Sequence, residues 1–128
     1  MMAWFQAAGV LCGGAAGAAC RFALGLTLAN GWLPWGILTA NVLGCLLMGV
    51  LQGVMRRLDR PFVVGYCLLG TGFLGGFTTF SSFAVDTLLL WRDGHGALAG
   101  LNLALNLFLG VGAVGAGYAL AMRFPRRV

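Results

Sequence analysis

The densest group of side chains that could do chemistry runs from Gly75 to Phe83, where hydroxyl residues and phenylalanines follow a pair of glycines. A hydroxyl can donate a hydrogen bond to an anion, and the edge of an aromatic ring carries partial positive charge. Phe80 and Phe83 are three residues apart, so they share one face of a helix. A narrow pore lined by such groups would suit a small, hard anion. The same spacing is also compatible with two ordinary packing residues.

Three other polar residues lie within long apolar stretches, where ionisable or amide groups are candidates for function. Asn41 needs hydrogen-bond partners in an apolar medium, and could either join two helices or contact a ligand. Arg21 could extend to the membrane interface, or provide a positive vestibule that gathers anions. Asp86 could cap a helix or hydrogen-bond a neighbour.

The composition indicates a membrane protein. Of the 128 residues, 60% are hydrophobic and 9% are charged, whereas soluble domains carry about 25% charged residues. A protein with so few charged residues has an apolar exterior, and such an exterior needs the lipid bilayer as its solvent. The net charge of +5 comes from arginines between and after the apolar stretches, which is a topology signal, and we expect no nucleic-acid partner. No nucleotide motif, metal-ligand spacing or catalytic triad is recognisable, so we expect no enzyme.

Charged residues and turn residues divide the chain into four apolar stretches, which predict an all-α membrane protein with a single domain over 1–128. The predicted transmembrane helices are 3–28, 35–55, 62–91 and 97–122. The third would be about 45 Å long, against a hydrocarbon core of about 30 Å. Because Gly75 and Gly76 permit non-helical backbone, we predict a break near 75–77 and a second helical piece from Thr78 to about 91. Such a break is tolerated only inside protein or beside a polar cavity.

The arginines predict the orientation in the membrane. With the amino end inside, six of them face the cytoplasm (56, 57, 60, 123, 126 and 127), against Arg92 and Arg21 on the other side. This bias favours both termini in the cytoplasm.

The sequence resembles the Fluc (also called CrcB) family of fluoride channels along its whole length. The resemblance rests on three segments: 13–22 around Arg21, 39–44 around Asn41, and above all Gly75-Gly76-Phe77-Thr78-Thr79-Phe80-Ser81-Ser82-Phe83. It implies a multi-pass protein of the bacterial inner (plasma) membrane that lets fluoride leave the cytoplasm passively. It also implies an antiparallel, dual-topology homodimer with two pores.

The resemblance further implies roles for individual residues. Phe80 and Phe83 would turn their ring edges to fluoride, and Asn41 would donate its amide. Ser81 and Thr39 would add to the polar lining, and Arg21 would lie at the vestibule. A structural sodium ion (Na+) at the dimer centre would be held by the backbone carbonyls of Gly75 and Thr78.

Some residues depart from the family pattern. Ala84 and Asp86 stand where the family commonly has a hydroxyl residue and Glu, and Asn102 and Asn106 stand where serines often continue the polar lining. Gly110 offers no side chain at all. The arginine bias also leaves open a partner that is a homologous subunit inserted the other way, in place of a second copy.

Two other classes of function remain open. A small four-helix proton-coupled multidrug exporter would need an intramembrane carboxylate, and only Asp86 is available. A membrane assembly protein without transport activity is supported only by close glycine pairs such as Gly13/Gly17, Gly49/Gly53 and Gly72/Gly76.

Overall fold

The computed structural model describes residues 2–58 and 62–123 of the chain. Three membrane-length helices are continuous: α1 (Met2–Thr27), α2 (Trp35–Met55) and α6 (Gly96–Arg123). The third span, Val63–Arg92, consists of α3 (Val63–Tyr66), the π-helical η1 (Cys67–Leu74), α4 (Gly75–Phe77) and α5 (Phe80–Arg92). All four spans are long and apolar enough to cross a membrane. The prediction of an all-α, multi-pass membrane protein with four spanning helices is confirmed.

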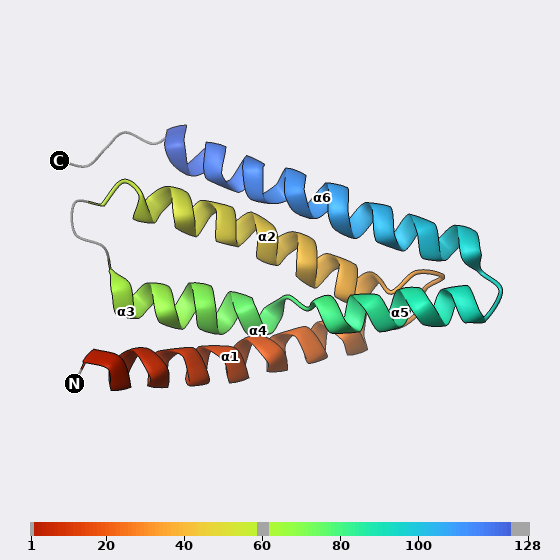
Figure 1. Ribbon diagram of the computed structural model, residues 1–128, viewed down its shortest axis with the longest axis horizontal. Coiled ribbons are helices and arrows are strands. Elements are labelled where there is room, and N and C mark those ends of the chain that lie inside the picture. The colour runs from red at the N-terminus through yellow and green to blue at the C-terminus, as the bar shows by residue number, and fades with distance from the viewer. Residues whose placement is uncertain (1, 59–61, 124–128) are drawn as a thin grey trace.

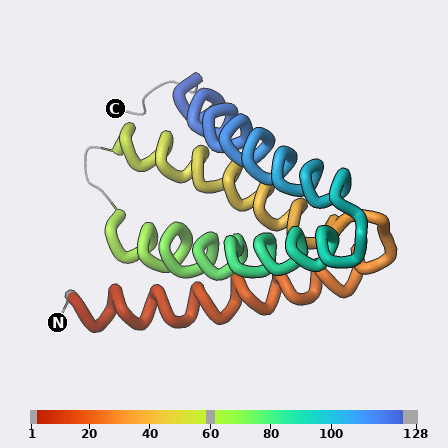
Figure 2. Tube along the Cα trace, turned by 45° about the vertical axis from the view of Figure 1, so that its right-hand side comes forward, coloured from red at the N-terminus to blue at the C-terminus, as the bar shows by residue number. Residues whose placement is uncertain are grey.

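The four spans run up and down beside one another (Figure 1). The start of α1, the end of α2, the start of α3 and the end of α6 lie together at one end of the molecule. The third span lies beside α1, and α2 lies beside α6, in both Figure 1 and Figure 2. At the other end, α5 turns into α6 through Gly94, whose φ of 85° is a conformation that favours glycine.

Glycines let α1 and the third span approach backbone to backbone. A Cβ atom at Gly13 or Gly17 would collide with the carbonyl oxygen of Leu68 or Phe73, respectively. Because lipid provides no hydrophobic force between helices, such close van der Waals packing is a main source of helix association in membranes. Gly13 and Gly17 therefore lie at a close contact between helix backbones.

The third span is interrupted, but not where the sequence analysis placed the interruption. Gly75 keeps right-handed helical backbone, with φ −64° and ψ −37°. The non-helical residues are Thr78, with φ −82° and ψ 156°, and Thr79, with φ −153° and ψ 128°. The predicted break near 75–77 and the predicted start of the second piece at Thr78 are both wrong, because the break is at Thr78 and Thr79 and α5 begins at Phe80.

The physical reason is that the paired glycines allow close packing rather than unwinding. A Cβ atom at Gly76 would collide with the carbonyl oxygen of Gly14 on α1. At these glycines the third span is still helical and lies directly against α1. The break comes after them in the sequence, at Thr78 and Thr79.

Arginines join the ends of α2 and α6. Arg56 Nη1 donates to Tyr118 Oη at 2.7 Å, and Arg57 Nη2 donates to the carbonyl of Met122 at 2.6 Å. Three of the arginines counted in the orientation argument, 60, 126 and 127, lie outside the described residues.

Candidate functional site

Asn41, on α2, hydrogen-bonds the backbone at the break in the third span through its side-chain amide. Its Oδ1 accepts a hydrogen bond of 2.8 Å from the Thr79 N–H, and its Nδ2 donates to the Thr79 carbonyl at 3.1 Å. In a continuous helix the Thr79 N–H would donate to the Gly75 carbonyl. A buried backbone group that leaves its helix needs another partner, and Asn41 provides one for both polar groups of Thr79.

Two neighbouring features let the chain turn from the break into α5. Thr79 is the N-cap of α5, and its Oγ1 accepts from the Ser82 N–H at 3.2 Å. Gly44, one turn after Asn41 on α2, leaves room for Thr78, because a Cβ atom at Gly44 would collide with Thr78 Cγ2. The segment 39–44 thus contributes two things: the amide of Asn41, which hydrogen-bonds the backbone of Thr79, and the space at Gly44, which the side chain of Thr78 occupies.

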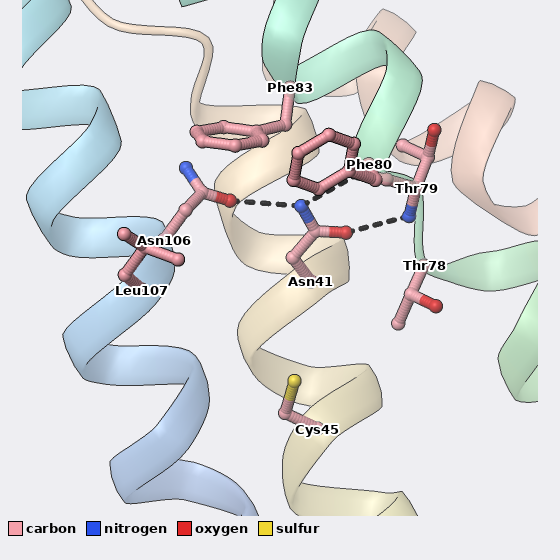
Figure 3. Close-up of a pocket in the computed structure, with 8 residues that line it drawn as sticks. All are labelled: Asn41, Cys45, Thr78, Thr79, Phe80, Phe83, Asn106 and Leu107. Carbon is pink, nitrogen blue, oxygen red and sulfur yellow. Dashed lines mark hydrogen bonds between the residues drawn. The ribbon is translucent and has the colours of Figure 1, made fainter.

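A cavity of about 220 Å³ opens beside the break. Figure 3 shows its lining, which comes from α2, the break, α5 and α6: Asn41, Cys45, Thr78, Thr79, Phe80, Phe83, Asn106 and Leu107. The cavity therefore combines two asparagines and two threonines with two phenylalanines.

Phe80 and Phe83 lie on the same face of α5 and both reach this cavity. Their ring centroids are 5.5 Å apart, and the ring planes meet at 66°, so that an edge of one ring approaches the face of the other. Phe83 is buried, with 4% of its surface exposed, whereas Phe80 is 76% exposed. Within this single chain, the cavity is thus open on the side of Phe80.

A second amide from α6 faces Asn41 across the cavity. Asn41 Nδ2 donates to Asn106 Oδ1 at 2.9 Å (Figure 3). Asn106 Nδ2 in turn donates to the carbonyl and to Oδ1 of Asn102, at 3.0 and 3.1 Å. The two asparagines that replace the expected serines are therefore joined to the proposed pore amide.

Arg21, on α1, brings a positive charge to the break. Its Nε donates to the Gly76 carbonyl at 3.2 Å, and its side chain is partly buried. It therefore binds the third span instead of extending freely to the interface. The adjacent Gly75 carbonyl has lost its helical donor, because the Thr79 N–H donates to Asn41.

Some predicted site residues lie outside the cavity lining. Thr39 is half-buried on α2, two residues before Asn41, and Ser81 is exposed, with its Oγ 3.2 Å from Thr79 Oγ1. Asp86 lies farther along α5 and borders two pockets of about 240 Å³ each, next to the loop between α1 and α2. The predicted pore residues Asn41, Phe80 and Phe83 meet in one cavity, which Thr78, a predicted sodium ligand, also lines.

Two functional features escaped the sequence analysis. Thr79 was considered only for its hydroxyl, although a threonine three residues before Ser82 at the start of an apolar helix is a typical N-cap signal. The chain of hydrogen bonds from Asn41 through Asn106 to Asn102 was also missed. The i, i+4 spacing of Asn102 and Asn106 places both on one face of α6 and could have indicated it.

Comparison with known proteins gives one consistent family. Residues 8–118 match the family described as CrcB-like protein, Camphor Resistance (CrcB). A fluoride-specific ion channel FluC of Rhizobium etli is 41% identical over 118 residues, covering 90% of this chain and 94% of the relative. The protein of the same name from Pseudoalteromonas translucida is 40% identical over 117 residues, covering 87% of this chain and 95% of the relative. The chain therefore belongs to the CrcB/FluC family.

Proposed function

We propose that this chain is a subunit of a fluoride-selective channel that lets fluoride leave the cytoplasm down its electrochemical gradient. Hydrogen fluoride is a weak acid that crosses membranes in its neutral form and ionises inside. A pore selective for the anion would then expel it from a negatively charged interior without ATP. Membership of a family whose curated relatives are named fluoride-specific ion channels supports this proposal. The observation that carries it is the cavity where Asn41, Phe80 and Phe83 meet.

In this proposal the cavity replaces the hydration shell of the ion. Asn41 offers an amide N–H, and the rings of Phe80 and Phe83 offer edges with partial positive charge. Ser81 and Thr39 lie outside the cavity and would extend the polar path on either side of it. Arg21 would raise the local fluoride concentration near the break.

We further propose that the working channel is an antiparallel dimer. The cavity is open beside Phe80, whose ring is 76% exposed although it lines the cavity. A second subunit packed on that side would close the pore wall. The arginine bias keeps a homologous subunit of opposite orientation as the alternative to a second copy. Reporters fused to the carboxyl end decide between them: signal on both sides of the membrane favours the homodimer, and signal on one side favours the paired relative.

A sodium ion (Na+) at the centre of the dimer would be held by the carbonyls of Gly75 and Thr78. The residues fit such a site, because the Gly75 carbonyl has lost its helical donor and Thr78 is extended. Carbonyls released at broken helices bind Na+ in other membrane proteins. The ion would supply a fixed positive charge that neutralises these dipoles. Replacing sodium by N-methylglucamine should lower the unfolding temperature of the purified dimer.

The direct test of the function is efflux from liposomes containing the purified protein. We expect rapid fluoride efflux that stops at electrical equilibrium, and chloride efflux no faster than from protein-free liposomes. Equal fluoride and chloride rates, or no flux, would contradict the proposal. The exporter alternative predicts instead that Asp86→Asn abolishes transport while Asn41 and Phe80 variants retain it.

A further inference from the structure

In this structure the amide of Asn41 has no spare N–H for an anion. Its two donors go to the Thr79 carbonyl and to Asn106 Oδ1, at 3.1 and 2.9 Å, and its oxygen accepts from the Thr79 N–H. An anion that binds Asn41 must therefore displace one of these acceptors. The Thr79 carbonyl belongs to the backbone of the break, so the displaceable acceptor is the side chain of Asn106.

A backbone group fixes the orientation of the Asn41 amide, and the side chain of Asn102 holds that of Asn106. The Thr79 N–H can only donate, so the oxygen of Asn41 must face it, and the nitrogen of Asn41 must face Asn106. The nitrogen of Asn106 faces Asn102, and it donates to the carbonyl at 3.0 Å and to Oδ1 at 3.1 Å. That carbonyl already accepts the backbone N–H of Asn106 within α6, so Oδ1 of Asn102 is the acceptor that decides the orientation. The oxygen of Asn106 is left pointing at Asn41 (Figure 3).

Asn102 and Thr87 hold this orientation from behind the cavity. Asn102 is completely buried, with 0% of its surface exposed, and its Oδ1 also accepts from Asn106. Asn102 Nδ2 donates to Thr87 Oγ1 at 2.8 Å, and Thr87 Oγ1 donates to the Phe83 carbonyl at 2.8 Å. From the cavity to the backbone of α5, each side chain thus donates a hydrogen bond to the next and accepts one from the previous. Neither residue belongs to the cavity lining.

We propose that Asn102 and Thr87 are positioning residues that turn the carbonyl oxygen of Asn106 toward Asn41, so that it competes with fluoride for the Asn41 amide. A carbonyl oxygen also repels an anion, whereas the Asn106 N–H₂ group would bind one. The latch of Asn102 and Thr87 keeps that N–H₂ group turned away. It therefore weakens fluoride binding, and conduction requires binding that is weak enough for the ion to leave.

Thr87→Val tests this proposal, because it removes the hydroxyl at the far end of the latch while keeping the shape of the side chain. Once Asn102 loses its acceptor, its amide can turn its own N–H₂ group toward Asn106. The oxygen of Asn106 then turns to Asn102, and its N–H₂ group is free to donate to fluoride. We expect the fluoride concentration for half-maximal efflux from liposomes to fall about tenfold, the equivalent of roughly one hydrogen bond. The maximal rate should fall as well, because fluoride leaves more slowly. Thr87→Ser keeps the hydroxyl and should behave as the wild type.

Asn102→Leu is the second test, for use if Thr87→Val does not assemble. It fills the buried position with a side chain of similar size, and we expect the same fall in the half-maximal fluoride concentration. In an Asn106→Ala background, neither substitution should change the half-maximal concentration, because the competing oxygen is already gone. A lower maximal rate with an unchanged half-maximal concentration would mean a purely structural role and overturn the proposal.

This inference rests on the pore proposed above, and the two can fail separately. If Asn41→Ala and Phe80→Ile leave fluoride efflux unchanged, the assignment of the pore is wrong, and so is the positioning role of Asn102 and Thr87. If those variants lose efflux while Thr87→Val leaves the half-maximal concentration unchanged, only the latch is wrong.

Discussion

The two halves of the third span use different chemistry to solve the same problem of packing in lipid. The first half, η1 and α4, lies against α1 through contacts between glycines and backbone carbonyls. The second half, α5, lies against α6 across a chain of amide and hydroxyl hydrogen bonds. Thr78 and Thr79 separate the two halves, and Asn41 replaces the backbone partners that Thr79 loses.

The comparison teaches that one membrane span can be closely packed on one side of a break and polar on the other. The first half meets α1 through glycine contacts and otherwise borders a pocket lined by apolar side chains, whereas the second half borders a cavity of about 220 Å³ with polar groups in its lining. Substitutions in the first half should therefore change folding, and substitutions in the second half should change transport. Four substitutions with successively smaller expected effects on stability test this division.

Gly17→Val should disrupt the contact between α1 and the third span. Its side chain would collide with the Phe73 carbonyl and crowd the Phe77 N–H. Overpacking of this kind costs about 3 kcal/mol where the facing atoms are backbone. Thermal unfolding of the protein in detergent checks it. Gly25→Ala on the same helix is the control, since no atom of the other described helices lies within 4 Å of its added Cβ; equal stability of both variants would refute the close contact.

Asn41→Leu should destabilise the break and also stop transport. It leaves the N–H and the carbonyl of Thr79 without their side-chain partner, at a cost of about 2 kcal/mol. Fluoride efflux per reconstituted protein should fall at least about tenfold, since the pore loses its amide donor. Gln52→Leu, at an exposed position on the same helix, is the control and should keep both properties. Normal efflux in Asn41→Leu would place the pore elsewhere.

Thr79→Val should weaken the start of α5 while keeping the shape of the side chain. It removes the oxygen that accepts from the Ser82 N–H, and loss of an N-cap costs about 1 kcal/mol. Thr79→Ser retains the oxygen and should unfold at the wild-type temperature. Chemical denaturation of both variants measures the difference, and identical curves for Val and Ser would argue against the cap.

Tyr118→Phe should have the smallest effect. It removes the exposed hydrogen bond with Arg56, at the end of α2 and α6 that lies away from the break, and should cost about 0.5 kcal/mol. Fluoride efflux should be unchanged. A large loss of efflux in this variant would show that transport depends on more than the polar half of the third span.

The sequence was sufficient to predict the four spans and an interruption in the third, but not the position of the break. The four spans follow from apolar stretches bounded by charges, and the placement of Phe80 and Phe83 on one face follows from helical spacing. Because glycine weakens helices in isolation, the pair Gly75-Gly76 by itself predicts a break. In the folded protein, Gly76 is pressed against the carbonyl of Gly14, and this contact favours the helix.

The polar contacts were harder to predict because they join residues far apart in the sequence. Asn41 could be recognised as a buried amide in need of partners, but its bonds to Thr79 and Asn106 depend on how α2 lies between the break and α6. The attachment of Arg21 to the Gly76 carbonyl depends in the same way on the packing of α1.

The division of the third span is tested most directly by fluoride efflux from liposomes containing Phe80→Ile or Phe73→Ile. Phe80 lines the cavity, whereas Phe73 stacks on Phe77 in the first half, with ring centroids 5.8 Å apart. We predict that Phe80→Ile loses most of its efflux per folded channel and that Phe73→Ile conducts as the wild type does. Efflux that survives in Phe80→Ile but is lost in Phe73→Ile would contradict this account.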